Sequence, residues 1–171
     1  MNQASGKGKL NIHAVPRVTS VVVSVGVGKN RDDKVFLEAV QKDLKAITGQ
    51  MPHECRAKKA VAGFNVRQGN LVAYRVTLRG QRMNDFVRRL VHLTLPRVRD
   101  FRGVGVSSFD GHGNLNYGLK EQLAFPEIHP EKTDAVFGVQ VNIITSAPDD
   151  KSGIKLLREL NFPLAEASEL D

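Results

Sequence analysis

The chain has 171 residues, 41% of them hydrophobic and 25% charged, which is typical of a globular domain with its own apolar core. Its single cysteine, Cys55, excludes an internal disulfide framework and a cysteine-built metal centre, and it suits a reducing compartment. No apolar run approaches the roughly 18 residues of a membrane helix, and the first 13 residues lack the apolar stretch of a secretory signal. We therefore expect a soluble cytoplasmic protein without a membrane partner.

The positive charge is concentrated in the middle of the chain. The net charge is +7, yet residues 55–109 contain 12 lysines and arginines and only two acids, Asp85 and Asp100. We call these 12 cations the basic belt: Arg56, Lys58, Lys59, Arg67, Arg75, Arg79, Arg82, Arg88, Arg89, Arg97, Arg99 and Arg102. The planar fork of arginine pairs with two phosphate oxygens at once. A solvated basic face is the alternative, but so uneven a distribution favours a polyanionic partner, above all nucleic acid.

The first half of the chain predicts three strands and a helix. Residues 17–25 are β-branched and almost continuously apolar, which predicts a strand buried on both faces or nearly so. Asp32 or Asp33 then caps a helix that ends at Gly49. Residues 52–56 form a candidate short strand. Residues 71–80 alternate, so that two arginines and a threonine share one face of a sheet: Arg75, Thr77 and Arg79.

The second half predicts two helices, a hairpin and a long strand. Residues 84–95 form an amphipathic helix that Pro96 stops, with Arg88 and Arg89 outward and His92 near the core side. Residues 103–119 predict a hairpin with a glycine-rich turn, 125–134 a loop, and 136–146 a strand. Asp149 or Asp150 opens a last helix that runs through Leu160.

This order of elements predicts an α+β fold with a mainly antiparallel sheet and helices packed on one face. We expect a single RNA-binding domain over residues 14–164, between a flexible tail at 1–13 and an acidic tail at 165–171.

The sequence offers little support for catalysis or for cofactor binding. The turn GVGKN, residues 26–30, has neither phosphate-loop nor dinucleotide-fingerprint spacing, so a plain glycine turn is expected. His53 and Cys55 alternate onto one strand face, but two ligands do not close a metal site. His112 is expected to be a turn residue or a phosphate contact. With no nucleophile setting and no carboxylate pair, we expect no enzyme, cofactor, metal or small-molecule substrate.

The segment RAKKAVAGFNVRQGN, residues 56–70, combines four cations, two glycines and one aromatic residue without any acid. Proteins hold structured RNA through its phosphates and contact exposed bases with aromatic and arginine planes. We therefore expect the cations to reach phosphates and Phe64 or Arg67 to lie against a base or sugar. The alternative is an ordinary mobile loop with Phe64 in the core.

Long motifs along the chain resemble the bacterial large-subunit ribosomal protein L5 family, which anchors 5S rRNA in the central protuberance. The resemblance runs from about Val15 to Pro163, and the motifs that carry it are AVPRVTSVVVSVGVG, ITGQMP, RAKKAVAGFNVRQGN, VTLRGQRM, LPRVRDFRGV, SFDGHGNLNYGLKEQLAFPEI and LNFP. Members normally begin with a helix of a few turns, whereas only about a dozen polar residues precede Val15 here. The resemblance thus implies a shortened N-terminus and an apolar patch exposed on the free protein.

The resemblance also implies three contact regions and no catalysis. The family's 5S rRNA-binding positions fall on Gln50, Thr77 and Ser24, the last usually asparagine, and strand alternation adds Arg75 and Arg79. The loop expected to contact the peptidyl-site (P-site) tRNA carries Arg56, Lys58, Lys59, Phe64, Arg67 and Gln68. The segments facing the small-subunit head across an intersubunit bridge carry Arg97, Arg99, Asp100, His129 and Lys132. The implied partners are 5S rRNA, 23S rRNA, P-site tRNA and neighbouring ribosomal proteins, including one of the small-subunit head. An RNA chaperone or assembly factor and a nucleotide-dependent enzyme are the competing hypotheses.

Overall fold

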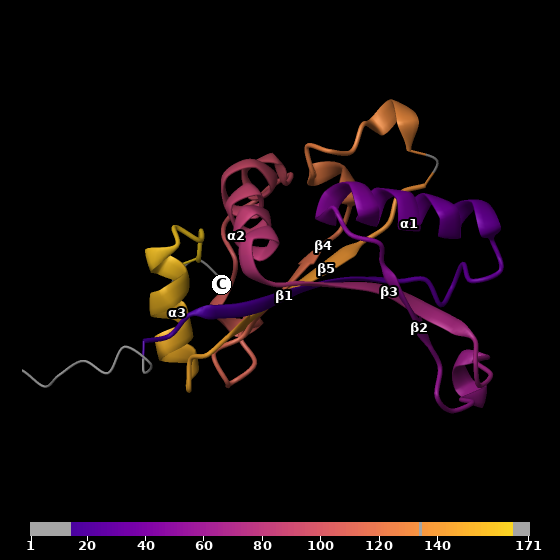
Figure 1. The fold of residues 1–171 in the computed structure, drawn as a ribbon, viewed down its shortest axis with the longest axis horizontal. Helices are drawn as coiled ribbons and strands as arrows, with labels where there is room; N and C mark the ends of the chain where they lie inside the picture. Colours follow the sequence, from indigo (N-terminus) through magenta and orange to yellow (C-terminus); the bar gives the residue numbers. More distant parts are fainter. Residues whose placement is uncertain (1–14, 134, 166–171) are drawn as a thin grey trace, which may run out of the picture.

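A single antiparallel sheet of five strands organises the molecule (Figure 1). The structure is a computed structural model that describes residues 15–133 and 135–165, apart from the side chain of Lys132. The strands are β1 (Val18–Gly26), β2 (His53–Arg56), β3 (Leu71–Leu78), β4 (Leu115–Leu119) and β5 (Val139–Thr145). They lie in the order β2-β3-β1-β5-β4, with β1 at the centre. The predicted α+β fold with an antiparallel sheet is therefore confirmed.

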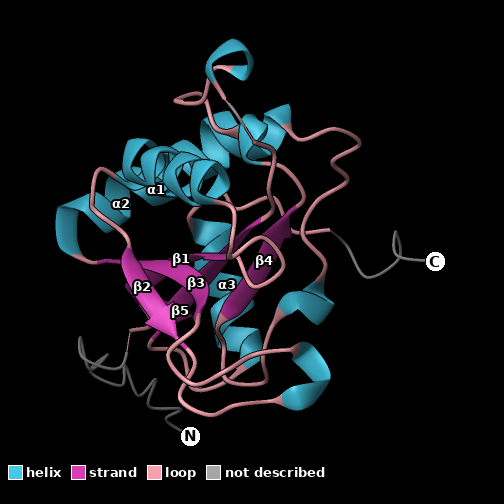
Figure 2. Cartoon of the chain, turned by 90° about the vertical axis from the view of Figure 1, so that its right-hand side faces the viewer, coloured by secondary structure: helices cyan, strands magenta, loops and turns pink. Residues whose placement is uncertain are grey.

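Two helices cover one face of this sheet, and a third lies across its end. Helix α1 (Lys34–Thr48) begins where the Asp33 carboxylate accepts from the Phe36 N–H at 3.2 Å and ends at Gly49, whose φ of 67° suits glycine. Helix α2 (Gly80–Arg89) lies beside α1 on the same side of the sheet (Figure 2). Helix α3 (Asp150–Glu159) follows β5 and stands at the end where β1 begins (Figure 1). None of the described helices is long and apolar enough to cross a membrane.

The core lies between the sheet and the two helices on it. Strand β1 contributes Val21, Val23 and Val25, which are at most 1% exposed, and Leu44 and Ile47 of α1 are fully buried against them. On the other side of β1, Val22 and Ser24 are only partly buried. The expectation that β1 is buried on both faces or nearly so is therefore wrong for the second side, where Ser20 is buried but no helix covers most of the strand. We call that second side of the sheet the open face.

The second helix begins earlier and ends less regularly than the sequence predicts. It starts at Gly80 instead of Asn84, because Met83 also turns into the core. After Arg89 the chain continues as a π-helical turn, Leu90–Thr94, and a 3₁₀ turn, Leu95–Arg97, that carries Pro96 within it. His92 is exposed rather than packed, since Val91 and Thr94 take the inner positions.

The predicted hairpin over residues 103–119 is mostly absent. Only Leu115–Leu119 is a strand, and its partner is β5. One isolated bridge joins Phe109 to Leu115, and Val104 instead bridges Leu164 near the C-terminus. The glycine-rich turn itself is present between Phe109 and Leu115, but long-range pairing of Val104 and of β4 replaces most of the predicted hairpin.

Both predicted tails fall largely outside the described residues. The tail at 1–13 and the implied loss of an N-terminal helix cannot be placed on this structure. Ala165, assigned to the acidic tail, belongs to the folded body: it is 4% exposed, and its N–H donates to the Val104 carbonyl at 3.0 Å.

Candidate nucleic-acid interface

Strand register collects polar side chains in two rows across the open face. One row contains His53, Arg75, Ser24, Gln140 and Gly118, which are paired in that order from β2 to β4. The next row contains Thr77, Val22, Asn142 and Asn116. Partners in an antiparallel sheet point to the same side, so both rows project together. Within these two rows there is no carboxylate.

Small residues form a hollow at the centre of the open face. Gly26, Ala73, Gly118 and Gly138 border a hollow beside Ser24 and Gln140. No atom lies within 4 Å of where a side chain on Gly26 or Gly118 would begin. The backbone of a ligand can therefore approach these strands closely at this hollow.

Three of the five residues expected to bind 5S rRNA share this face. Ser24 and Arg75 are direct cross-strand partners, and Thr77 lies in the adjoining row. Arg75 is exposed and forms no ion pair within the described residues. Arg79 follows β3 as the N-cap residue of α2 and is exposed, so it continues the same side of the strand beyond the sheet.

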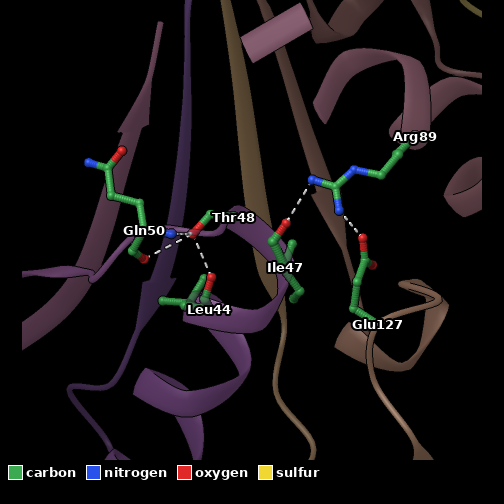
Figure 3. Close-up of polar contacts among 6 residues, drawn as sticks. All are labelled: Leu44, Ile47, Thr48, Gln50, Arg89 and Glu127. Atoms are coloured by element: carbon green, nitrogen blue, oxygen red, sulfur yellow. Dashed lines mark hydrogen bonds and ion pairs between the residues drawn. The ribbon is translucent and has the colours of Figure 1, made fainter. Parts of the chain in front are cut away.

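Gln50 stands apart from the rows, just after α1. Figure 3 shows its side-chain amide pointing away from the hydrogen bonds that close the helix. In that network the Thr48 hydroxyl donates to the Leu44 carbonyl at 2.6 Å and accepts from the Gln50 N–H at 3.4 Å. The side-chain amide of Gln50 makes no hydrogen bond within the described part of the chain. His53, three residues further on, lies on the open face.

The basic loop, residues 56–70, is a hydrogen-bonded hairpin that projects beyond β2 and β3 (Figure 1). Val61 and Val66 exchange two backbone hydrogen bonds, at 2.8 and 3.2 Å, below a 3₁₀ turn at Ala62–Phe64. Phe64 is 80% exposed, so the alternative that packs it in the core is wrong. Lys58, Lys59, Arg67 and Gln68 are also exposed.

Arg56 has a structural role that its sequence context did not suggest. Its guanidinium donates to the Glu54 carboxylate at 2.7 Å and to the Gly69 carbonyl at 3.3 Å. The contact with Gly69 joins the two arms of the loop at its base, and the ion pair with Glu54 holds the guanidinium along β2. Of the four cations of the loop, Arg56 is therefore the least available for contact with a partner.

Most of the basic belt is unpaired. Among the described residues, ion pairs join Arg31 to Asp32, Arg56 to Glu54, and Arg89 to Glu127. Arg89, predicted to point outward, is partly buried and also donates to the Ile47 carbonyl at 3.1 Å (Figure 3). The other ten belt cations form no ion pair within the described structure, so their charge is available to a partner.

The residues expected at an intersubunit bridge do not form one described cluster. Arg97, Arg99 and Asp100 line a cleft at the edge of β4. His129 is exposed in a separate segment and is not among the residues that line that cleft. The side chain of Lys132 lies outside what the structure describes.

The glycine-rich turn around His112 is filled by the protein's own carboxylates. Asp150 accepts from the Gly111 and Gly113 N–H groups at 3.1 and 2.8 Å, and Asp110 accepts from the His112 N–H at 2.9 Å. The hydrogen bond from the Asn114 side chain, with that from the His112 N–H, lowers the pKa of Asp110 below its ordinary value. Since an anion already occupies these donors, the structure favours a turn residue over a phosphate contact for His112.

Sequence reasoning missed the residues that complete the open face. Asn116, Gln140 and Asn142 carry amide groups into its rows, and the Asn142 side chain donates to that of Asn116. Their alternation with buried Leu115, Val141 and Ile143 was readable as a strand pattern, but the face they share with Ser24 follows only from the register. No cluster of three or more His, Cys, Asp or Glu side chains suited to a metal exists within the described residues.

Comparisons with known proteins agree along almost the whole chain. The family model described as "Ribosomal protein L5" matches residues 11–67, and the model of the C-terminus of the same ribosomal family matches residues 71–164. "Large ribosomal subunit protein uL5c" of Paulinella chromatophora is 51% identical over 153 residues, which cover 90% of this chain and 86% of that protein. "Large ribosomal subunit protein uL5" of Halothermothrix orenii is 48% identical with the same coverage, and that of Chloroflexus aggregans is 50% identical over 156 residues, covering 91% and 87%.

The fold, the open face and these matches lead to one assignment. The chain belongs to the ribosomal protein L5 family, and like the family it is a structural, non-enzymatic protein of the ribosome in the cytoplasm.

Proposed function

We propose that this protein binds 5S rRNA in the central protuberance of the large ribosomal subunit through the open face of its sheet. The observation that carries the proposal is the acid-free pair of rows in which Arg75 faces Ser24 and Thr77 lies alongside. The relatives that cover most of the chain are named proteins of the large ribosomal subunit, which supports the same placement.

The chemistry of the open face suits a folded RNA strand. RNA presents phosphates and 2′-hydroxyls along its shallow groove, and proteins recognise it mainly by contacts to these groups. The Arg75 guanidinium offers a bidentate fork to phosphate, while the Ser24 and Thr77 hydroxyls and the Asn142 amide exchange hydrogen bonds with ribose. Glycines at positions 26 and 118 allow the RNA backbone to come within reach of these short side chains.

A second part of the proposal concerns the loop at residues 56–70, which we assign to contact with the P-site tRNA. Lys58, Lys59 and Arg67 are exposed and form no ion pair in the described structure, and Phe64 presents its ring to solvent. Charge of this kind holds a phosphate backbone without reading its sequence, which a contact to every tRNA requires. The loop projects beyond β2 and β3 (Figure 1), at the end of the sheet next to the open face. We therefore assign it an RNA contact separate from that of the strands.

A third part is a contribution to an intersubunit bridge with a protein of the small-subunit head. We assign it to two separate segments, residues 97–100 and 129–132. Arg97 and Arg99 of the first segment and His129 of the second are exposed. Contacts to 23S rRNA and to neighbouring ribosomal proteins use the remaining belt cations.

The binding reaction itself tests the first part. We expect the purified chain to bind 5S rRNA with a logarithmic affinity that falls against the logarithm of salt concentration with a slope of about −4 to −5, for about six phosphates. A slope near zero refutes the proposal. The chain should also be present in purified large subunits; an RNA chaperone or assembly factor with the same charge would be absent from them.

A further inference from the structure

The chain between β4 and β5 leaves the sheet and returns to it on the side of α1 (orange in Figure 1). It begins with the 3₁₀ turn Gln122–Ala124 and ends at Phe137, two residues before β5. Residues 129–132, which we assign to the intersubunit bridge, lie between these ends, and we call them the bridge segment. The contacts at the two ends therefore decide where the bridge segment stands.

The side chain of Gln122 joins the two ends. Gln122 is fully buried, and its side-chain oxygen accepts from the Phe137 N–H at 2.9 Å while its amide donates to the Ala135 carbonyl at 2.6 Å. The backbone N–H of Gln122 also donates to the Phe137 carbonyl at 3.1 Å. One residue thus satisfies the backbone groups at the point where the chain returns to the sheet.

The same two ends are attached to α1. The Gln122 amide donates to the carboxylate of Asp43 at 3.4 Å, and Asp43 is only 7% exposed. The ring of Phe137 packs edge to face against that of Phe36, with centroids 6.1 Å apart and an interplanar angle of 79°. A polar and an apolar contact therefore fix the base of the segment to one helix.

The bridge segment stands on a buried support. Phe125 and Ile128, which precede it, are 2% and 7% exposed. Its own turn is closed where the Thr133 hydroxyl donates to the His129 carbonyl at 3.1 Å. Residues 129–131 are exposed. The part that can meet a partner is thus short, and its position depends on the residues beneath it.

We propose that Gln122 is the positioning residue of the bridge segment and holds it where it meets a protein of the small-subunit head. The inference rests on the bridge part of the proposed function and adds the residue that sets its geometry. A buried amide stabilises a structure only when its polar atoms have partners, and here both the oxygen and the nitrogen do. A segment that is held before binding loses less conformational entropy when a partner binds.

Hydrogen exchange on the full chain tests the closure by Gln122. Gln122→Met keeps the length of the side chain and removes its hydrogen bonds. The Phe137 amide should then exchange about 10- to 100-fold faster, for loss of about two hydrogen bonds, while the amides of β1 and β3 keep the protection of the parent. Gln81→Met is the matched control, because Gln81 is exposed on α2 and donates only to Asp85 within the described residues.

Crosslinking in whole ribosomes tests the positioning. A photoreactive residue at position 129 of the parent should crosslink to a small-subunit head protein. Gln122→Met should lower the yield about 3- to 10-fold, because the segment must then be ordered when the partner binds. Gln81→Met should leave the yield unchanged. All variants are compared well below the Tm of each, so that a loss of global stability alone does not change the yield.

A second variant keeps the test valid if Gln122→Met does not fold. Gln122→Glu retains the length and the acceptor for the Phe137 N–H, but it places a second carboxylate against Asp43. The yield should fall, and Gln122→Glu/Asp43→Asn should recover part of it, because the new amide donates across the same contact. Asp43→Asn alone is the reference for this pair. Absence of recovery overturns the anchoring of the segment to α1.

Two further results overturn the inference while the proposed function stands. One is parent-like exchange of the Phe137 amide in Gln122→Met, which shows that the side chain does not close the segment. The other is faster exchange with a parent-like crosslink, which shows that the segment reaches its partner without Gln122. Absence of any crosslink from the parent refutes the bridge part of the proposed function, and the inference with it.

Discussion

Arg89 and Glu127 form an ion pair that joins α2 to the segment after β4, and the same guanidinium donates to the Ile47 carbonyl of α1 (Figure 3). One arginine of the basic belt thus ties three elements together instead of facing RNA. Its neighbour Arg88 is exposed and forms no ion pair within the described residues. Of these adjacent arginines, only Arg89 therefore has a structural contact within the described residues.

Exchange of Arg89 should lower the stability of the protein, whereas exchange of Arg88 should leave it unchanged. Arg89→Gln leaves the Glu127 carboxylate, one of whose oxygens is buried without a hydrogen bond, without its cation. Because the side chains of the pair are 36% and 22% exposed, the expected loss is about 1–2 kcal/mol rather than the full cost of a buried pair. Thermal unfolding measures it as a decrease in Tm of about 2–8 °C.

Arg88→Gln is the matched control, with the same chemical change one residue away. Its Tm should equal that of the parent, while its affinity for RNA should be equal or slightly lower. Equal Tm losses for the two variants would show that Arg89 does not hold the elements together.

Arg75→Gln should weaken 5S rRNA binding without destabilising the protein. Arg75 is the one belt cation within the two polar rows, and it is exposed. Loss of one phosphate contact lowers affinity about tenfold and makes the salt slope about one unit shallower. Filter binding across a salt series measures both quantities, with Lys155→Gln on α3 as the control. A parent-like slope would place the RNA on another surface.

The sequence was sufficient where structure is local. Alternation along 71–78 placed Arg75 and Thr77 opposite the buried Tyr74 and Val76, and the Asp33 cap and Gly49 bounded α1 as predicted. Each of these depends on residues within a few positions of one another, which periodicity and capping rules describe well.

Prediction failed where a distant residue decides the conformation. The glycine-rich stretch after residue 103 resembled a hairpin, but Gly103 is packed against Ala165 and Val104 pairs with Leu164, some 60 residues away. Likewise, no local pattern shows that Arg89 meets Glu127 or that Gly118 joins a hollow to a cleft. Such features follow from the packing of the whole chain.

The turn around Asp110 should make stability depend on acid pH. Its folded-state pKa is lowered first by the Asn114 side-chain hydrogen bond. A carboxyl group with a lowered folded pKa contributes stability that is complete above its ordinary pKa of 3.8 and is lost as the pH falls through the lower folded value. Thermal unfolding of Asp110→Ala and the parent between pH 6 and 2.5 should therefore show a difference in Tm that shrinks as acid is added.

A second variant, Asn114→Ala, keeps the Asp110 carboxylate. It removes the side-chain hydrogen bond that is the largest cause of the lowered Asp110 pKa. We expect this variant to lose less stability on acidification than the parent does. A difference between parent and Asp110→Ala that is constant across the whole pH range would contradict the assigned hydrogen bonds.

Neutralising the loop at residues 56–70 should separate the two RNA contacts that we propose for this protein. Lys58 and Lys59 are exposed, and the hydrogen bonds that order the loop run through backbone groups and Arg56. Lys58→Gln/Lys59→Gln should therefore keep the hairpin, weaken retention of P-site tRNA by ribosomes, and leave 5S rRNA affinity nearly unchanged. The open face is not altered by the change, whereas the loop loses two phosphate contacts, each a salt-sensitive contribution. Lys151→Gln/Lys155→Gln carries the same charge loss on α3 and should leave tRNA retention intact. Equal losses in tRNA and 5S rRNA binding would mean that one continuous surface serves both RNAs.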